Sequence, residues 1–138
     1  MTRRILALMC LAILISCQKS LPTPPSSLGS GIVVYEHANY LGDSAHIDTD
    51  IDDLRDFKGP CTTTTNCGQF GCDVTETWND CISSVRVAPG WHATLYQDDG
   101  FRDDRLNVSE DIPNLQLIGG CSSRGFNDCV TSIRVFRP

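Results

Sequence analysis

The stretches WNDCISSVRV (residues 78–87) and FNDCVTSIRV (residues 126–135) are two versions of one phrase, 48 positions apart (126 − 78). Each contains an aromatic residue, then Asn-Asp-Cys, an aliphatic residue, two hydroxyl residues and a strand-like tail. A second pair, IVVYEHANYLGDSAHID (residues 32–48) and ATLYQDDGFRDDRLNVS (residues 93–109), matches at an offset of 61 (93 − 32). The chain therefore contains two copies of one unit.

The two offsets differ by 13 residues (61 − 48), so the first copy carries an insertion. It falls in KGPCTTTTNCGQFGCDVTET (residues 58–77), which contains three cysteines. A surface loop tolerates such an insertion because the entropy of loop closure grows slowly with length. We therefore expect residues 58–77 to form a disulfide-bonded loop within the first copy, residues 31–88, and we assign the second copy to residues 91–138.

Short segments that alternate apolar and polar residues predict β-strands. They are IVVYE, SAHID, SVRV, WHATLYQ, RLNVS and SIRVF, separated by Gly, Asn, Asp and Pro. No segment has the spacing of an amphipathic helix, although DDLRDF and IPNLQLI could each form one helical turn. We expect an all-β domain with about four strands in each copy, packed as two sheets. The predicted core residues are Val33, Tyr35, Ile47, Val85, Val87, Leu95, Leu106, Ile133 and Val135, and Trp78 is expected to pack beside them.

These motifs resemble those of the βγ-crystallins, over essentially all of residues 31–138. The family's opening motif, Y-E-x-x-x-[F/Y]-x-G-x-S, matches Tyr35 to Ser44, and its ending, [N/D]-[N/D]-x-x-[S/T]-S, matches residues 79–84 and residues 127–132. The resemblance implies one β-sandwich domain made of two Greek-key motifs, with residues 58–77 as a disulfide-rich loop insertion.

The opening of the second copy departs from the family pattern. Asp103 and Arg105 stand where the first copy has Gly42 and Ser44. The glycine permits a tight hairpin fold, and Asp adopts a left-handed backbone better than most residues, although at a cost. We expect the second hairpin to be looser or differently bonded.

The resemblance also implies two calcium sites. Calcium is a hard cation that takes six to eight oxygen ligands, and each repeated phrase supplies an amide, a carboxylate and two hydroxyls. The family pattern assigns the first hydroxyl, and the carbonyl of the residue after the opening Tyr, to the sites, while Ser84 and Ser132 are expected to brace the loops. The metal ligands predicted in this way are Glu36, Asn79, Asp80, Ser83, Gln97, Asn127, Asp128 and Thr131. The alternative is turn chemistry alone, in which these side chains bond only to backbone amides.

The N-terminal residues have the form of a targeting segment. Residues 1–16 carry two arginines before an apolar run too short to span a bilayer comfortably. Leu14-Ile15-Ser16-Cys17 resembles the bacterial lipobox, whose cysteine is acylated; ordinary cleavage and an uncleaved anchor are the alternatives. Residues 17–30 are rich in Pro, Ser and Gly and predict a tether. We expect an exported lipoprotein of the bacterial cell envelope, with Gln18 favouring the outer membrane.

Charge narrows the choice of partners. The chain has 11 basic and 17 acidic residues, and loss of Arg3 and Arg4 with the signal leaves 9 and 17, a net charge of −8. There is no basic patch, so nucleic-acid binding is disfavoured. The acidic stretch DTDIDDLRDFKG is not an EF-hand, because Asp53 stands where the turn needs Gly and Gly59 where the ion needs Glu.

Six cysteines follow Cys17, and an even number in a small exported domain indicates disulfides. Six cysteines allow fifteen pairings. Cys72 precedes Cys81 and Cys121 precedes Cys129 by similar intervals, each pair bracketing an aromatic-Asn-Asp sequence. We therefore predict the pairs Cys72–Cys81 and Cys121–Cys129, which leaves Cys61–Cys67.

Three classes of function remain open. The first is a calcium-binding module tethered to a membrane. The second is a protein-binding module, such as a protease inhibitor of the kind known in this fold, which would use the loop at residues 58–77. The third, an enzyme, has little support: no histidine lies in a nucleophile motif, and no pair of carboxylates is recognisably placed for acid–base chemistry.

Overall fold

The computed structural model of the chain describes residues 28–138, except residues 122 and 124. The expected signal segment and most of the expected tether lie outside the described residues. In the described part of the chain no helix is both long enough and apolar enough to cross a bilayer. The elements are β1 (Ile32–His37), η1 (Ala38–Tyr40), β2 (Leu41–Ile47), β3 (Lys58–Gly68), β4 (Gly71–Thr77), β5 (Ser84–Val87), β6 (His92–Asp98), β7 (Arg102–Val108), η2 (Leu115–Leu117) and β8 (Ser132–Phe136).

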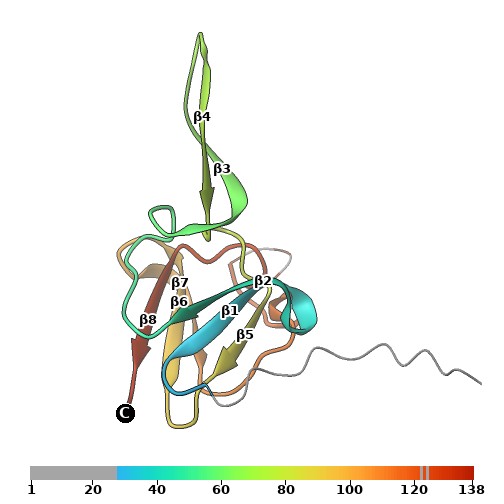
Figure 1. The fold of residues 1–138 in the computed structure, drawn as a ribbon, viewed down its shortest axis with the longest axis vertical. Helices are drawn as coiled ribbons and strands as arrows, with labels where there is room; N and C mark the ends of the chain where they lie inside the picture. The colour runs from blue at the N-terminus through green and yellow to red at the C-terminus, as the bar shows by residue number, and fades with distance from the viewer. Residues whose placement is uncertain (1–27, 122, 124) are drawn as a thin grey trace, which may run out of the picture.

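The two copies form two matching three-stranded antiparallel sheets, ordered β2-β1-β5 and β7-β6-β8 (Figure 1). In the first, Tyr35 pairs with Ser44 and Ser84; in the second, Tyr96 pairs with Arg105 and Ser132. These apolar, β-branched segments take strand conformation because one face of each can be buried against the other sheet. The prediction of an all-β domain is confirmed.

Each copy sends a short segment into the sheet of the other. Ile51, from the first copy, forms a bridge with Ile133 of β8, and Ile112, from the second, forms a bridge with Val85 of β5. The fourth strand expected in each copy is thus a single bridge, exchanged between the sheets, as Greek-key connectivity requires. Of the two expected helical turns, η2 forms near residues 115–117, whereas DDLRDF is an irregular turn.

The core lies between the two sheets. Leu54, Trp78, Ile82, Leu115, Phe126 and Val130 join the buried strand residues there. Of the two core residues predicted in β1, Tyr35 is buried but Val33 is only partly buried, and Ile32 and Val34 are the fully buried residues of this strand. Because side chains alternate across a strand, the inward-facing set includes every second residue, and an all-apolar run does not reveal which set that is. Val87 and Leu106 are partly buried at the edge of the core.

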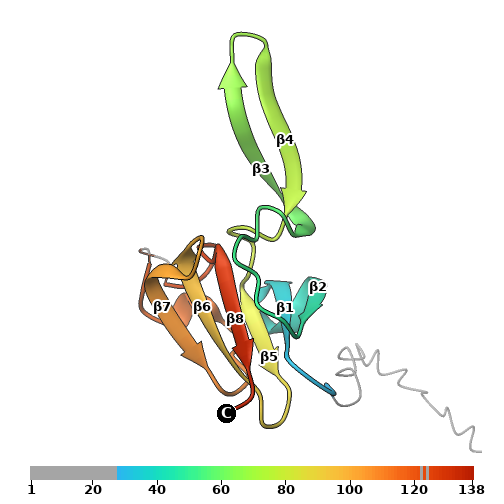
Figure 2. The same ribbon diagram turned by 90° about the vertical axis from the view of Figure 1, so that its left-hand side faces the viewer.

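The insertion in the first copy is not a loop. Its residues form a two-stranded antiparallel ribbon, β3 and β4, which projects away from both sheets (Figures 1 and 2). We call residues 58–77 the arm. Thr62, Thr63 and Thr64 pair with Glu76, Thr75 and Val74, so the Thr-rich sequence that suggested a loop supplies β-branched residues to a strand. Phe70 is fully exposed in the turn at its tip.

The ribbon structure of the arm determines which cysteines form disulfides. Cys121–Cys129 is confirmed, but the predicted pairs Cys72–Cys81 and Cys61–Cys67 are wrong: the structure has Cys61–Cys81 and Cys67–Cys72. Cys67 and Cys72 flank the turn at the tip, with Cα atoms 4.0 Å apart, whereas Cys61 lies near the base, 5.8 Å from Cys81. A ribbon keeps Cys72 far from Cys81, because consecutive residues rise more than 3 Å along a strand. The wrong pairing was predicted because Cys72 and Cys81 have nearly the same spacing in the sequence as Cys121 and Cys129, which do pair.

The second hairpin is as regular as the first. Asp103 has φ of 66° and takes the left-handed conformation of Gly42, whose φ is 76°. The β1–β2 and β6–β7 pairs shift register at equivalent places, between Tyr35 and His37 and between Tyr96 and Asp98. The backbone of the second hairpin is therefore not loosened.

Candidate functional site

The two repeated phrases meet at the interface between the copies. The backbone N–H of Asp80 donates to the carbonyl of Val130 at 3.1 Å, and that of Asp128 donates to the carbonyl of Ile82 at 3.2 Å. Both aspartates have a left-handed backbone, with φ of 52° and 53°. This geometry carries each aspartate out of its own strand and places it against the other loop.

The last serine of each phrase holds its loop in place. Ser84 Oγ donates to the carbonyl of His37 at 2.7 Å and accepts from the N–H of Tyr40 at 3.0 Å. Ser132 Oγ likewise donates to the carbonyl of Asp98 at 2.6 Å and accepts from the N–H of Phe101. Both serines are completely buried. The expectation that they brace the loops is confirmed.

Three predicted ligands converge at the end of β1, in what we call the first site. Ser83 Oγ donates to the carbonyl oxygen of Glu36 at 2.7 Å and lies 3.4 Å from Asp128 Oδ1. A hydroxyl and a carbonyl from one copy thus face a carboxylate from the other. These are the hard oxygen donors that calcium takes, and the lone pairs of a carbonyl and a carboxylate are available beside the hydroxyl.

A corresponding pocket, the second site, lies at the end of β6. Asn79, Asp80 and Thr131 line it, and the N–H of Thr131 donates to the carbonyl of Tyr96 at 2.9 Å, as the N–H of Ser83 does to that of Tyr35. The pocket has a volume of about 380 Å³. Gln97 follows Tyr96 in β6, at the position of Glu36 in β1. The structure thus brings Asn79, Asp80 and Thr131 together at the second site, whereas Gln97 is not among the residues that line this pocket.

The asparagines of the two phrases support the neighbouring aspartates. Asn79 Nδ2 donates to Asp80 Oδ2 at 2.7 Å, and Asn127 Nδ2 donates to Asp128 Oδ2. Asn79 is 9% exposed, and its Oδ1 is buried with no hydrogen-bond partner among the described residues. Buried polar atoms normally have partners, so this oxygen is a free acceptor at the second site.

Burial sets the electrostatics of Asp80. It raises the pKa of Asp80 above its ordinary value; the hydrogen bond from Asn79 lowers it in part, and the charge of Asp128 raises it again. The two carboxylates therefore repel one another. A cation between the loops would relieve both the desolvation and the repulsion.

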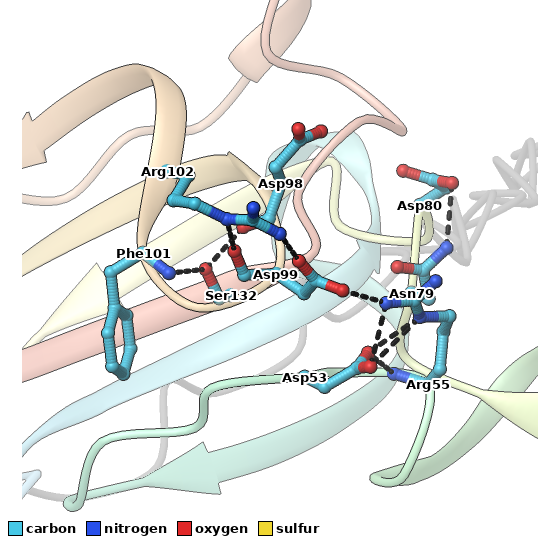
Figure 3. Close-up of polar contacts among 9 residues, drawn as sticks. All are labelled: Asp53, Arg55, Asn79, Asp80, Asp98, Asp99, Phe101, Arg102 and Ser132. Atoms are coloured by element: carbon cyan, nitrogen blue, oxygen red, sulfur yellow. Dashed lines mark hydrogen bonds and ion pairs between the residues drawn. The ribbon is translucent and has the colours of Figure 1, made fainter.

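An ion-pair network beside the second site was not predicted from the sequence. Arg55 Nη2 lies 2.8 Å from Asp53 Oδ2 and 2.5 Å from Asp99 Oδ2, and Asp99 also pairs with Arg102 (Figure 3). Both arginines line the pocket with Asn79 and Asp80. Arg55 belongs to the DDLRDF segment, for which the sequence suggested only a helical turn; aligning this segment with the matching one of the second copy would have singled out the arginine.

Within residues 28–121, 123 and 125–138, no three His, Cys, Asp or Glu side chains gather closely enough to form a metal cluster. The donor set at the first site is instead one carboxylate, one hydroxyl and one carbonyl. Such mixed sets suit calcium, which accepts backbone and hydroxyl oxygens and completes its shell with water. They do not suit zinc, which prefers thiolate and imidazole ligands.

Comparison with known proteins agrees with this architecture. A family model described as "Peptidase inhibitor family I36" matches residues 33–109. Spherulin-3A from Physarum polycephalum is 28% identical over 104 residues, which is 75% of this chain and 80% of that protein. Development-specific protein S from Myxococcus xanthus is 44% identical over 57 residues, 41% of this chain, and the match spans only 28% of that protein.

Solved structures share the fold. A βγ-crystallin domain from Flavobacterium johnsoniae is 28% identical, with a TM-score of 0.52 over 77% of this chain and 93% of that domain. A chain solved in work on the evolution of the eye lens βγ-crystallin domain fold has a TM-score of 0.60 at 23% identity, covering 86% of this chain and 95% of its own. The described domain therefore has the βγ-crystallin fold, made of two Greek-key motifs.

Proposed function

The chain belongs to peptidase inhibitor family I36 and has the βγ-crystallin fold, and from these premises we propose that it binds calcium between its two repeated loops. The observation that carries the proposal is the convergence of Ser83 Oγ with the Glu36 carbonyl at 2.7 Å and with Asp128 Oδ1 at 3.4 Å. Bound calcium would supply a divalent charge that draws oxygens of both copies together, so its effect would be to stabilise the folded domain.

Calorimetry and thermal melts test this proposal. Calcium that binds only the folded state stabilises it by about 2.7 kcal/mol when its concentration is 100 times the Kd. We expect heat of binding and a higher Tm in calcium than in chelator. Asp128→Asn keeps the left-handed turn but removes a charge from the first site, so it should weaken binding. The absence of heat, with the same Tm in millimolar calcium and in chelator, would rule the function out.

We further propose, as a second function, that the arm binds a peptidase. Family membership supports this role, and the match at residues 33–109 includes the whole arm. The arm stands clear of both sheets (Figure 2). It carries the fully exposed Phe70 at its tip and is cross-linked by Cys67–Cys72 beside that tip. A constrained ribbon loses little conformational entropy on docking, and an exposed aromatic side chain is a suitable anchor.

A panel of serine, cysteine and metallopeptidases tests the second function. Phe70→Ala should weaken inhibition without changing the melt, because the side chain makes no buried contacts. Val74→Ala, another exposed apolar residue but away from the tip, is the matched control. If replacing residues 62–76 with a short Gly/Ser turn leaves inhibition intact, the arm is not the inhibitory element.

Export and tethering complete the proposed function. The signal-like residues 1–16 and the lipobox-like sequence before Cys17 support a lipid-anchored protein of the bacterial envelope, favouring the outer membrane. Metabolic labelling with a radioactive fatty acid should label the wild-type protein and not Cys17→Ser. Equal labelling of both, or of neither, would contradict acylation at this residue.

A further inference from the structure

The segments that cover the two sites are related at an offset of 61 residues, and their backbones make matched hydrogen bonds. Residues 51–55 are hydrogen-bonded to the second repeated phrase, and residues 112–116 are hydrogen-bonded in the same way to the first. Leu54 N donates to the Thr131 carbonyl at 2.7 Å, and Leu115 N donates to the Ser83 carbonyl at 2.9 Å. Two further backbone hydrogen bonds are matched in the same way. Ile51 N donates to the Ile133 carbonyl as Ile112 N donates to the Val85 carbonyl. The carbonyl of Asp52 accepts from Gly100 N as the carbonyl of Pro113 accepts from Asn39 N.

The correspondence extends to the turns within these segments. The N–H of Arg55 donates to Asp53 Oδ1 at 2.9 Å, and the N–H of Gln116 donates to Asn114 Oδ1 at 2.9 Å. Arg55 and Gln116 are therefore equivalent residues in equivalent turns (116 − 55 = 61). They differ in charge: the guanidinium of Arg55 lines the second site, whereas Gln116, its counterpart in the second copy, carries a neutral amide.

The other members of the ion-pair network likewise have no charged counterpart at the first site, where Asn114 corresponds to Asp53. Asp99 corresponds to Ala38, and Arg102 corresponds to Leu41, at the same offset. Neither residue of the first copy can form an ion pair. The guanidinium of Arg55 is thus held by Asp53 and Asp99 at the rim of the second site, in the pocket that Asn79 and Asp80 line (Figure 3).

We propose that Arg55 is a built-in competitor for the cation of the second site. The proposal rests on the proposed calcium binding and assigns unequal roles to the two sites. Calcium would bind first where Asp128, Ser83 and the Glu36 carbonyl converge. It would bind the second site only when the guanidinium withdraws, because two cations a few ångströms apart repel one another strongly in a partly buried pocket.

The second site nevertheless retains the oxygen atoms of a cation site. Asn79 Oδ1 is buried without a partner among the described residues, so the guanidinium lies in the pocket but does not bond this acceptor. Asp80 and Thr131 line the same pocket. Removing the positive charge of Arg55 should therefore release a usable site rather than destroy one.

Two reciprocal substitutions test the proposal. Arg55→Gln gives the second site the residue of the first, and Gln116→Arg gives the first site the residue of the second. The full chain and both variants are titrated with calcium chloride in a calorimeter. Both residues are exposed, so neither substitution should unfold the domain. Circular dichroism and the melt in chelator check that each variant is folded.

In the wild type we expect one calcium-binding event, with any second event at least about tenfold weaker, a difference of about 1.4 kcal/mol. Arg55→Gln should strengthen the second event at least about tenfold and leave the first unchanged. Gln116→Arg should weaken the first. Asp80→Asn assigns the events: combined with Arg55→Gln, it should remove the event that Arg55→Gln alone gains.

Failures of the two proposals are distinguishable. Two equal events in the wild type, or an Arg55→Gln titration identical to that of the wild type, would overturn the role of Arg55 while calcium binding stood. The wild type could instead show no binding while Arg55→Gln shows a single event that Asp80→Asn removes. That result would overturn the assigned function of the first site and support the role of Arg55 as a competitor. No binding by any variant would overturn both.

Discussion

Asp103 holds in the second hairpin the left-handed backbone that Gly42 holds in the first, with φ of 66° against 76°. A non-glycine residue in this conformation costs roughly 1 kcal/mol, less for Asp than for most residues. We therefore predict that Asp103→Gly stabilises the domain by up to about 0.5 kcal/mol, after the greater entropy that Gly has in the unfolded chain is subtracted. Urea unfolding measures the change.

The first hairpin supplies the matched control. A Cβ at Gly42 would lie 2.9 Å from Glu36 Oε2 and 3.0 Å from His37 Cδ2. Gly42→Ala should therefore destabilise the domain by about 1 kcal/mol, since strain and crowding combine. A lower urea midpoint for Asp103→Gly than for the wild type would contradict the first expectation.

The bracing serines should matter more than their size suggests. Ser84→Ala would remove two partly buried hydrogen bonds, one to the carbonyl of His37 and one from the N–H of Tyr40, at a cost of about 1–3 kcal/mol. Ser132→Ala should cost about the same, because its contacts are equivalent. The change is measured by urea unfolding in chelator. Ser109→Ala, at an exposed position, is the control, and equal midpoints for all three would refute the bracing role.

Acid should weaken the network at Arg55. The pKa of Asp53 is below its ordinary value, chiefly because Arg55 donates a hydrogen bond to it, and the pKa of Asp99 is lowered by Arg102 and then by Arg55. A carboxyl whose pKa is lower in the folded state stabilises the fold above its unfolded pKa, about 3.9. That contribution disappears as the pH falls through the folded pKa.

The fall in stability between about pH 5 and pH 3 should therefore be smaller in Arg55→Gln than in the wild type, since the variant has less to lose. Urea midpoints across this window measure it in chelator. Arg105→Gln, at an exposed position of β7, should keep the wild-type slope. Parallel curves for wild type and Arg55→Gln would contradict the prediction.

The disulfides should contribute unequally. Cys61–Cys81 joins the base of the arm to a buried residue across 20 positions, and its loss should cost about 3 kcal/mol. Cys67–Cys72 closes only the tip, so Cys67→Ser with Cys72→Ser should leave the melt of the two sheets nearly unchanged. Melts of the two double variants compare them, and peptide mapping without reduction checks the pairing. Recovery of a Cys72–Cys81 peptide would refute the arm as described.

The fold could be predicted from the sequence because both the opening motif and the ending motif of the unit occur twice, in the same order. Asp80, Asp128 and Ser83 could be found in this way, since each stands at a fixed place in the repeated phrase. The arm could not, because an isolated ribbon has no buried face and so no clear hydrophobic alternation. Arg55 escaped notice because its importance comes from its distance to Asp99, 44 residues away, a relation that only the folded chain creates.

The bridges at Ile51 and Ile112 bear on how the repeat could have arisen. Each half contributes a short bridging segment to the sheet of the other, so a single half would present an incomplete sheet and an open apolar face to water. A lone ancestral copy would have required a second, identical chain as its complement. Joining two such copies in one gene would have made that pairing independent of protein concentration. Each half could then diverge, and the arm and Arg55 are two differences between the halves.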